Sequence, residues 1–205
     1  MPAIILLAAG ASVRLGRPKQ LLPYHGQTLL RRAAETAVAA ATGAAVVVVT
    51  GAQHAALLPE LAGLPVQVAH CPAWAQGMGA SLKCGLAALE KEQALPEGVT
   101  LMLCDQPHVS PKLLRELVAT HTATGRTIVA CTYAGVQGVP VYFSALAVSL
   151  LRALPDEAGA GQLLKCYPEL VATVPFPPGA IDVDTEAQYA ALLAGGNTSE
   201  QEIKG

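Results

Sequence analysis

Aromatic and charged residues are both scarce in this chain of 205 residues. Phe, Trp and Tyr make up 4% of the sequence and charged residues 14%, whereas hydrophobic residues reach 52%. Ala, Val and Leu must therefore build the core, and the length suffices for one domain with a sizeable interior. The formal charge is −2, from 13 Lys and Arg against 15 Asp and Glu. This balance excludes bulk attraction to nucleic acid or an anionic membrane, but it allows a local cationic site for one phosphorylated small molecule.

Long apolar runs and paired cysteines are absent too. A membrane-spanning helix needs about 20 consecutive apolar residues, and polar residues, Gly or Pro interrupt each stretch earlier, despite a mean hydropathy of +0.42. Arg14 and Lys19 follow the apolar start instead of preceding it, the wrong order for a secretory signal. The odd number of cysteines, five, contains no Cys-x-x-Cys pair. We therefore expect a cytoplasmic protein without a membrane partner, whose cysteines are small buried hydrophobic residues.

Short aliphatic runs alternate with longer segments of helical periodicity. The first run, AIILLA at residues 3–8, is apolar at every position, which is typical of a strand buried on both faces. The alternation predicts a single-domain α/β three-layer sandwich with a mostly parallel, Rossmann-like sheet. Strands are expected at 3–8, 45–50, 66–69, 100–104, 127–132, 140–143 and 171–174, and helices at 28–41, 53–61, 77–91, 110–118, 145–153 and from 185.

The C-terminal residues differ in composition from the rest. Thr185 and Gln188 have the spacing of a capping box for the last predicted helix. From Gly195 onward the residues are mainly Gly, Asn, Ser, Glu and Lys. We therefore expect one domain over residues 1–194 and a flexible tail over 195–205.

A loop of small residues and cations follows the first predicted strand. Ligands of open α/β sheets bind beyond the carboxyl ends of the strands, and AGASVRLGRPK occupies that place at residues 9–19. Small residues let backbone N–H groups approach phosphate oxygens, and Arg14 and Lys19 can neutralise a triphosphate. Two common phosphate-binding motifs are excluded. Five residues separate Gly10 from Gly16 where a Walker A loop has four, and Ser12 stands where the dinucleotide-binding motif GxGxxG needs Gly.

Carboxylates follow two later segments. Asp105 comes directly after the strand predicted at 100–104, where it could hold Mg²⁺ bridging phosphates. Asp182 and Asp184 flank Val183, and at strand spacing both side chains would share a face and point into the site. The capping by Thr185 uses the same region, so the alternative is that one of the two only solvates the helix start.

These motifs together resemble the MobA-like nucleotidyltransferases. LLAAGASVRLGRPKQLLPYHGQTLL is similar to the family signature LxAGxSxRxGxxK, and later segments resemble the family in the expected order: CPAWAQGMGASLKCGLAAL, LMLCDQPHVS, GVQGVPVYF and IDVDTEAQY. Ala8-Ala9-Gly10 is similar to the branch of molybdenum cofactor cytidylyltransferases, because the guanylyltransferase branch typically has Gly where Ala9 stands. We expect the Ala9 methyl to narrow the base pocket toward a pyrimidine.

The resemblance implies a fold of the nucleotide-diphospho-sugar transferase type and assigns roles to residues. Arg14, Lys19 and Asp105 match catalytic positions, and Asp105 and Asp184 match the ligands of Mg²⁺, or alternatively Mn²⁺. Gln76, Gly77 and Ser81 match a segment that closes over the nucleotide. The nucleotide-binding residues implied in this way are Ala8, Ala9, Gly10, Ala11, Ser12, Arg14, Lys19, Gln76, Gly77 and Ser81.

The reaction implied is transfer of CMP from CTP to the phosphate of molybdopterin, with release of pyrophosphate. Two departures concern the acceptor: Val139 stands where related sequences often have His, and Gly161-Gln162 stand where they often have cations. The alternatives are transfer to a sugar phosphate or another phosphorylated metabolite, and a non-catalytic chaperone that binds molybdenum cofactor. Expected partners are CTP or another NTP, a molybdopterin-type acceptor and a molybdoenzyme client, but no nucleic acid.

Overall fold

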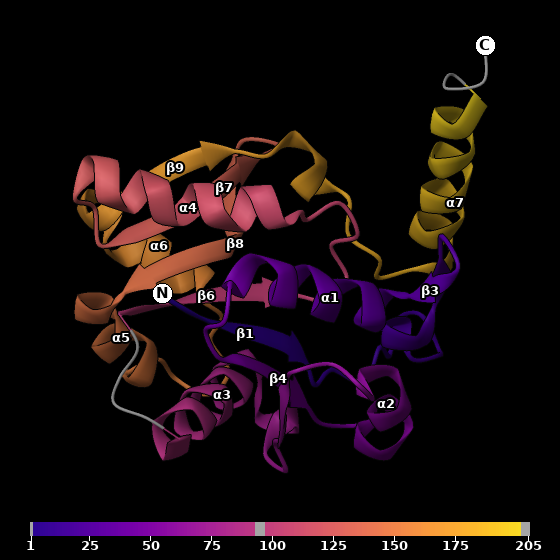
Figure 1. Cartoon of the computed structure of the whole chain (residues 1–205), viewed down its shortest axis with the longest axis horizontal. Coiled ribbons are helices and arrows are strands. Elements are labelled where there is room, and N and C mark those ends of the chain that lie inside the picture. The colour runs from indigo at the N-terminus through magenta and orange to yellow at the C-terminus, as the bar shows by residue number, and fades with distance from the viewer. Residues whose placement is uncertain (1, 93–96, 202–205) are drawn as a thin grey trace.

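A computed structural model describes residues 2–92 and 97–201 (Figure 1). Over these residues the main sheet has seven strands in the order β5-β4-β1-β6-β8-β7-β9. The strands are β1 (Ala3–Ala8), β4 (Val46–Thr50), β5 (Gln67–His70), β6 (Gly98–Leu103), β7 (Ile128–Tyr133), β8 (Val136–Ser144) and β9 (Val171–Pro175). The predicted single α/β domain with a mostly parallel sheet is confirmed.

Strand β8 is the exception to the parallel arrangement, because it runs antiparallel to both β6 and β7. Ala134 and Gly135 connect β7 to β8, and both have positive φ, 49° and 77°. A two-residue turn of this kind reverses the chain directly, whereas a parallel connection needs a crossover. The strand predicted at 140–143 is therefore the second half of a longer hairpin strand.

Helices cover both faces of the sheet. Ile5 of β1 packs in a core with α3 (Met78–Glu92), α5 (Ala145–Arg152) and α6 (Gly161–Cys166). Leu6 points to the other face, toward α1 (Leu29–Ala41), α2 (His54–Leu61) and α4 (Pro111–Thr124). Burial of each such side chain contributes about 1.5–3 kcal/mol. The uniformly apolar run at 3–8 is explained by this packing on both faces. The short helix α6 lies in a region that periodicity had not predicted to be helical.

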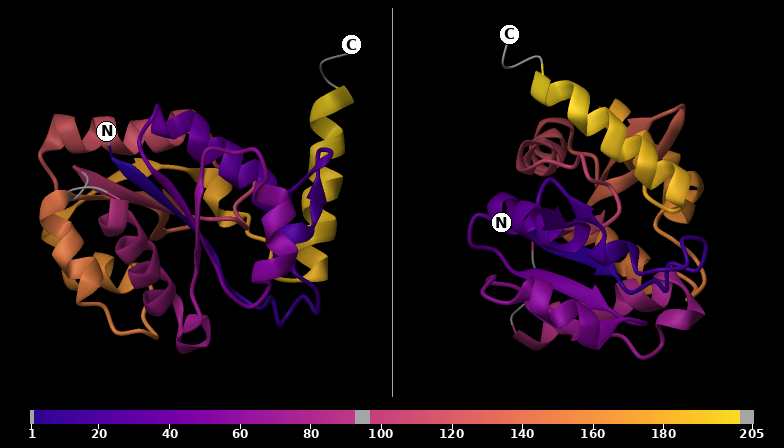
Figure 2. Two further views of the ribbon diagram at one scale, coloured as in Figure 1. Left: turned by 60° about the horizontal axis from the view of Figure 1, so that its bottom comes forward. Right: turned by 90° about the vertical axis from the view of Figure 1, so that its right-hand side faces the viewer.

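The last helix, α7 (Glu186–Gln201), extends away from the body of the protein (Figure 2). Its base belongs to a small third core, which contains Tyr189 and Leu192 together with Leu15 and Leu22. The hairpin of β2 (Pro23–Tyr24) and β3 (Gln27–Thr28), which was not predicted, lies here as well. The loop after β1 is thus placed beside the start of the C-terminal helix.

Helix α7 continues past residue 194, the expected end of the domain, as far as Gln201, and residues 202–205 lie outside the described residues. The flexibility expected for the tail stays a prediction. Extending a formed helix through a glycine costs only about 1 kcal/mol relative to Ala. The cysteines are free thiols as expected, but they are not all buried, because Cys166 is exposed and Cys84 is half-buried. No helix within residues 2–92 and 97–201 is long and apolar enough to cross a membrane.

Candidate functional site

The loop after β1 and the residues after β6 meet at one edge of the sheet. Strands β1 and β6 are adjacent and parallel, so their carboxyl ends lie side by side. A cavity of about 320 Å³, here called the β1–β6 cavity, opens between them. Of the predicted site residues, it is lined by Ala8, Ala9, Gly10, Lys19, Gly77, Ser81 and Asp105; Leu7, Gln20, Trp74, Ala75, Met78, Leu103 and Cys104 complete the lining.

The loop of residues 9–19 is held in shape by its own polar groups. Ser12 has a positive φ of 56°, and its carbonyl accepts hydrogen bonds from the N–H groups of Leu15 and Gly16, each at 3.1 Å. Its hydroxyl accepts from the N–H of Lys19 at 3.0 Å. Ser12 therefore supports the loop from within and does not line the cavity, and its contact with nucleotide stays a prediction.

Gln20 follows the same loop directly and binds back to its start, a role that the sequence analysis did not predict. Its side chain is 1% exposed, and Nε2 donates to the carbonyls of Ala8 at 3.0 Å and Gly10 at 2.8 Å. Its Oε1 accepts from Ser12 Oγ at 3.3 Å. A buried amide with all these partners is a structural clamp. An uncharged polar residue directly between Lys19 and two leucines is the signal that could have revealed it.

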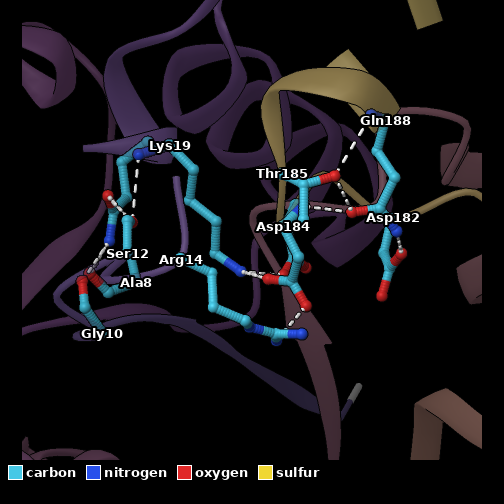
Figure 3. A network of polar contacts seen from close by, with 11 residues as sticks. Ala8, Gly10, Ser12, Arg14, Lys19, Asp182, Asp184, Thr185 and Gln188 are labelled. Atoms are coloured by element: carbon cyan, nitrogen blue, oxygen red, sulfur yellow. Dashed lines mark hydrogen bonds and ion pairs between the residues drawn. The ribbon is translucent and has the colours of Figure 1, made fainter. Parts of the chain in front are cut away.

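Lys19 lies at the centre of a network that joins three parts of the chain (Figure 3). Its Nζ forms ion pairs with Asp105 Oδ2 and with Asp184 Oδ1, the latter at 2.7 Å. Arg14 Nη2 contacts Asp184 Oδ2 at 2.5 Å. The structure thus brings together the loop after β1, the end of β6 and the segment before α7. These are the residues for which the sequence predicted catalysis and metal binding.

Burial and charge act against each other in this network. Burial opposes the charge of Lys19, but the carboxylates of Asp105 and Asp184 outweigh it and raise the pKa of the ammonium above its ordinary value. Burial raises the pKa of Asp105, which Lys19 offsets only in part. For Asp184 burial is outweighed by Lys19 and Arg14, which lower its pKa. Lys19 therefore stays protonated at neutral pH.

Asp105 retains one carboxylate oxygen for a ligand. Oδ1 is buried and has no hydrogen-bond partner among the described residues. An orphaned carboxylate oxygen is suited to a hard divalent cation. The described residues contain no group of three or more His, Cys, Asp or Glu side chains that could hold a metal. A metal held by Asp105 and Asp184 would therefore need oxygen ligands from nucleotide or water.

Asp182 and Asp184 have separate partners: Asp184 reaches Lys19, whereas Asp182 contacts the first turn of α7, as in the alternative that one of the two serves the helix start. Residues 181–184 form no strand. The N–H of Val183 donates to the carbonyl of Asp105 at 3.2 Å, which places the next side chain beside Lys19. Asp182 instead accepts from Gln188 Nε2 at 2.8 Å. The N–H of Gln188 donates to Thr185 Oγ1 at 3.2 Å, which confirms the predicted cap.

The segment predicted to close over nucleotide is already packed. Gln76 is exposed and does not line the β1–β6 cavity, whereas Gly77 and Ser81 do. A Cβ on Gly77 would lie 2.5 Å from the carbonyl oxygen of Asp156, and Lys83 Nζ pairs with the Asp156 carboxylate at 2.5 Å. Ala11 and Arg14 also lie outside the cavity lining, and Arg14 reaches the site through Asp184.

A second cavity of about 250 Å³ lies on the other side of Asp105. We call it the Gln106 cavity. It shares Leu103 and Asp105 with the β1–β6 cavity. Of the two departures on the acceptor side, only Val139 lines it, whereas Gly161 begins α6. The remaining lining residues are Gln106, Tyr133, Ala134, Val136, Gly179, Ala180 and Asp182.

A third cavity, also about 250 Å³, lies between α1 and α4 at the opposite end of the sheet. Its lining is mostly apolar and small, including Ala40, Ala41 and Val118. Arg115 is the charged lining residue, and its Nη1 donates to the carbonyl of Ala39 at 3.1 Å. The lining of this third cavity contains no residue of the polar network around Lys19, so the candidate site lies at the other end of the sheet.

Comparisons with known proteins identify a family and several relatives. The profile of a family described as MobA-like NTP transferase domain matches residues 4–173. Nicotine blue oxidoreductase of Paenarthrobacter nicotinovorans is 34% identical, covering 92% of this chain and 95% of that protein, and purine catabolism protein PucB of Bacillus subtilis is 30% identical over 78% and 79%. The crystal structure of Rv0371c from Mycobacterium tuberculosis H37Rv is 32% identical with a TM-score of 0.77, covering 95% of this chain and 98% of that one. A second structure of Rv0371c is a complex with manganese.

Proposed function

The chain belongs to the family of MobA-like NTP transferase domains and is a nucleotidyltransferase, and on this premise we propose that it transfers CMP from CTP to the phosphate of a molybdopterin-type acceptor. The observation that carries the proposal is the position of Lys19. Its ammonium contacts Asp105 and Asp184 at the wall of the β1–β6 cavity. A fixed cation beside two carboxylates suits a triphosphate that brings its own divalent metal.

The β1–β6 cavity would hold the donor nucleotide. Backbone groups of residues 8–10 line it, and Gln20 fixes their position through two carbonyls. Ala9 is buried and lines the cavity, and its methyl would limit the space for the base and so favour a pyrimidine. Trp74 contributes an aromatic wall.

Asp105 and Asp184 would hold the divalent metal, with the orphaned Oδ1 of Asp105 as one ligand atom. Mg²⁺ or Mn²⁺ would supply positive charge that offsets the charge of the phosphates. The manganese complex of Rv0371c supports this assignment through a relative of 30% identity in that comparison. Lys19 and Arg14 then offset negative charge on the phosphates from the side of the loop.

The transfer needs no general base. The acceptor phosphate is largely deprotonated at neutral pH, so one of its oxygens attacks the α-phosphorus of CTP directly. The bond from the α-phosphorus to the bridging oxygen breaks, and the electron pair leaves with pyrophosphate. Catalysis therefore depends on alignment and on charge stabilisation by Lys19 and Arg14.

Pyrophosphate release tests the proposal. We expect release with CTP, Mg²⁺ and molybdopterin cofactor, and weaker release with GTP, ATP or UTP. Release with a sugar phosphate and not with the pterin would support the alternative acceptor, which the loss of His at Val139 favours. Tight cofactor binding without release under any combination would indicate a chaperone and contradict the proposal.

The name of the 34% identical relative favours redox catalysis as a second candidate. Such a reaction would oxidise or reduce a substrate without consuming CTP. The arrangement of Lys19, Asp105 and Asp184 suits the binding of a triphosphate and its metal, and it gives no reason to expect turnover without CTP. Absorbance assays with and without CTP separate the two activities.

A further inference from the structure

Two cysteine thiols lie together where β5 meets α3. Cys71 follows directly after β5 and is 2% exposed, whereas Cys84 lies within α3 and is half-buried. Cys71 Sγ donates to the carbonyl of Ala80 at 3.8 Å, and Cys84 Sγ donates to the carbonyl of His70 at 3.5 Å. Ala80 lies one helical turn before Cys84, and His70 is the chain neighbour of Cys71. Each thiol therefore contacts the segment that carries the other.

The direction of side chains in a helix brings the two sulfur atoms close to one another. A helical side chain leans toward the preceding turn, so Cys84 Sγ lies over the turn that contains Ala80, which Cys71 contacts. Both cysteines belong to the same hydrophobic cluster, Cys71 inside it and Cys84 packed against it. Burial, together with the adjacent Cys71 thiol, raises the pKa of Cys84 to about 11. The two thiols therefore interact directly in the folded protein.

The unequal exposure of the two thiols gives them different roles in disulfide exchange. A small-molecule disulfide, such as oxidised glutathione, can reach half-buried Cys84 but not buried Cys71. The Cys84 thiolate would attack one sulfur of this disulfide, and the first glutathione would leave as a thiolate that takes up the proton from Cys84. The Cys71 thiolate would then attack the Cys84 sulfur and release the second glutathione, which takes up the proton from Cys71. Two protein thiols are thus oxidised by two electrons, and one small disulfide is reduced to two thiols.

We infer that Cys71 and Cys84 form a modification site, at which a small-molecule disulfide converts the two thiols into a reversible intramolecular disulfide. The bond would link the two ends of residues 72–83. This segment includes Trp74 and Ser81, which line the β1–β6 cavity. Oxidation would fix one wall of that cavity, and reduction would release it. The site needs neither nucleotide nor metal, so it is independent of the proposed function.

Peptide mapping after equilibration with oxidised and reduced glutathione tests the inference. Lys83 directly precedes Cys84, so trypsin separates the two cysteines into residues 33–83 and 84–91. Equilibration at mildly alkaline pH supplies Cys84 thiolate, and acid followed by alkylation under denaturing conditions traps the remaining thiols. We expect the two peptides to be joined, at least about tenfold in excess over Cys84 that carries glutathione, because the adjacent Cys71 outcompetes free glutathione. Glutathione on Cys84 beside a free Cys71, or no reaction of either thiol, would overturn the inference.

The other three cysteines provide the controls. Cys166 is exposed, so Cys166→Ser is the background that prevents links between molecules. Cys104 and Cys131 lie in the core on the other face of the sheet and should stay reduced, and their oxidation to the same extent would contradict the selectivity of the site. In the same background Cys71→Ser should stop at glutathione on Cys84, whereas Cys84→Ser should leave Cys71 unmodified. Glutathione on Cys71 of the Cys84→Ser variant would contradict the assigned order.

Trp74 gives a second readout that needs no substitution within the pair. It is the one tryptophan of the sequence, and its backbone N–H donates to the carbonyl of Cys71 at 3.2 Å. A disulfide quenches the fluorescence of a nearby indole, so the emission should fall as the peptide link forms and recover with dithiothreitol. Both changes should reach their half-points at the same ratio of oxidised to reduced glutathione. Unchanged emission of the linked protein would show that the bond does not affect the cavity wall and would overturn that part of the inference.

Discussion

Arg17 and Glu186 form a two-point ion pair between the loop after β1 and the first residue of α7. The distances are 2.7 Å from Nε to Oε1 and 2.9 Å from Nη2 to Oε2. The guanidinium also lies 5.5 Å from the centre of the Tyr189 ring. Neither Arg17 nor Glu186 lines the β1–β6 cavity, so the pair positions the loop without touching the nucleotide site.

Charge reversal at either residue of this pair should weaken nucleotide binding, and reversal at both should restore it. We expect Arg17→Glu and Glu186→Arg each to raise the KM for CTP about two- to fivefold, because exposed ion pairs contribute little individually. The double variant should recover most of the loss, since it restores the pair with opposite polarity. Steady-state kinetics of all four proteins measure this, and a double variant as poor as the worse single one would contradict the positioning role.

Removal of the Lys19 ammonium should reduce the chemical step more than nucleotide binding. We expect Lys19→Met to lower kcat about 100-fold or more, since charge stabilisation inside a site acts mainly on the transition state. The Kd of CTP should rise less than about tenfold. Lys19→Arg is the matched control, because it keeps the charge but not the compact geometry. Equal losses in kcat and affinity would argue against the catalytic role.

The same ammonium should compete with a metal for Asp105 and Asp184 when no nucleotide is bound. Lys19→Met leaves these two carboxylates without their shared partner. We therefore expect this variant to bind Mn²⁺ several-fold more tightly than the wild-type protein in the absence of nucleotide. Electron paramagnetic resonance of free Mn²⁺ measures the affinity, and weaker binding by the variant would exclude the competition.

The dependence of activity on Mg²⁺ should distinguish Asp105 from Asp182, which lines the Gln106 cavity together with it. Asp105→Asn keeps the size of the side chain but removes the charge, so Mg²⁺-dependent pyrophosphate release should fall about 100-fold or more. Asp182→Asn should leave the Mg²⁺ concentration for half-maximal activity unchanged, because Asp182 contacts Gln188 and not Lys19. Equal Mg²⁺ dependence of Asp105→Asn and the wild-type protein would contradict the assignment.

The stability contributed by Asp184 should be lost in acid. Its pKa is lowered in the folded protein, so its contribution is complete above the unfolded pKa of about 4 and disappears as the pH falls through the lower folded value. Asp105 acts in the opposite direction, because burial raises its pKa. We expect the melting temperatures of wild type and Asp184→Asn to differ at pH 7 and to converge toward pH 3. Thermal unfolding of both proteins between pH 7 and about pH 3 measures the difference in melting temperature.

The close packing beneath the β1–β6 cavity should make Gly79 sensitive to substitution. A Cβ at this position would lie 2.1 Å from the carbonyl oxygen of Pro155, a backbone atom that cannot rotate away. We expect Gly79→Ala to destabilise the protein by about 1–3 kcal/mol. Gly161→Ala is the control, since nothing lies within 4 Å of its Cβ, and it should be neutral or slightly stabilising. Denaturant unfolding of both variants measures the difference.

The sequence predicted those parts of the site that depend on local patterns. Apolar runs that end in Ala9-Gly10 and in Asp105 identify strand ends, and parallel neighbours bring such ends together. The different directions of Asp182 and Asp184 could not be predicted, because they depend on Gln188 and on a backbone contact 78 residues away, from Val183 at 183 to Asp105 at 105. Periodicity contains no information on such long-range contacts.

The antiparallel direction of β8 could not be predicted from the sequence either, but for a different reason. The alternation of strand and helix favours parallel connections, and only the positive φ values of Ala134 and Gly135 make a tight reversal. Ala rarely adopts this conformation, so the turn has no strong sequence signal. The Gln106 cavity is built partly on this hairpin, which explains why the contributions of Tyr133, Ala134 and Val136 to its lining were not predicted.

The attachment of the β1 loop to the start of α7 has a consequence for biosynthesis. Asp184 and Glu186 lie after the matched range of 4–173 and near the end of the chain, whereas their partners Arg14, Arg17 and Lys19 are made first. During translation the seven strands can therefore all emerge before the cationic loop meets its acidic counterparts. A nascent chain that has not yet emerged as far as Asp184 and Glu186 would have all seven strands but a loop without these two ion-pair partners, so the full charge network around Lys19 assembles only after the sheet.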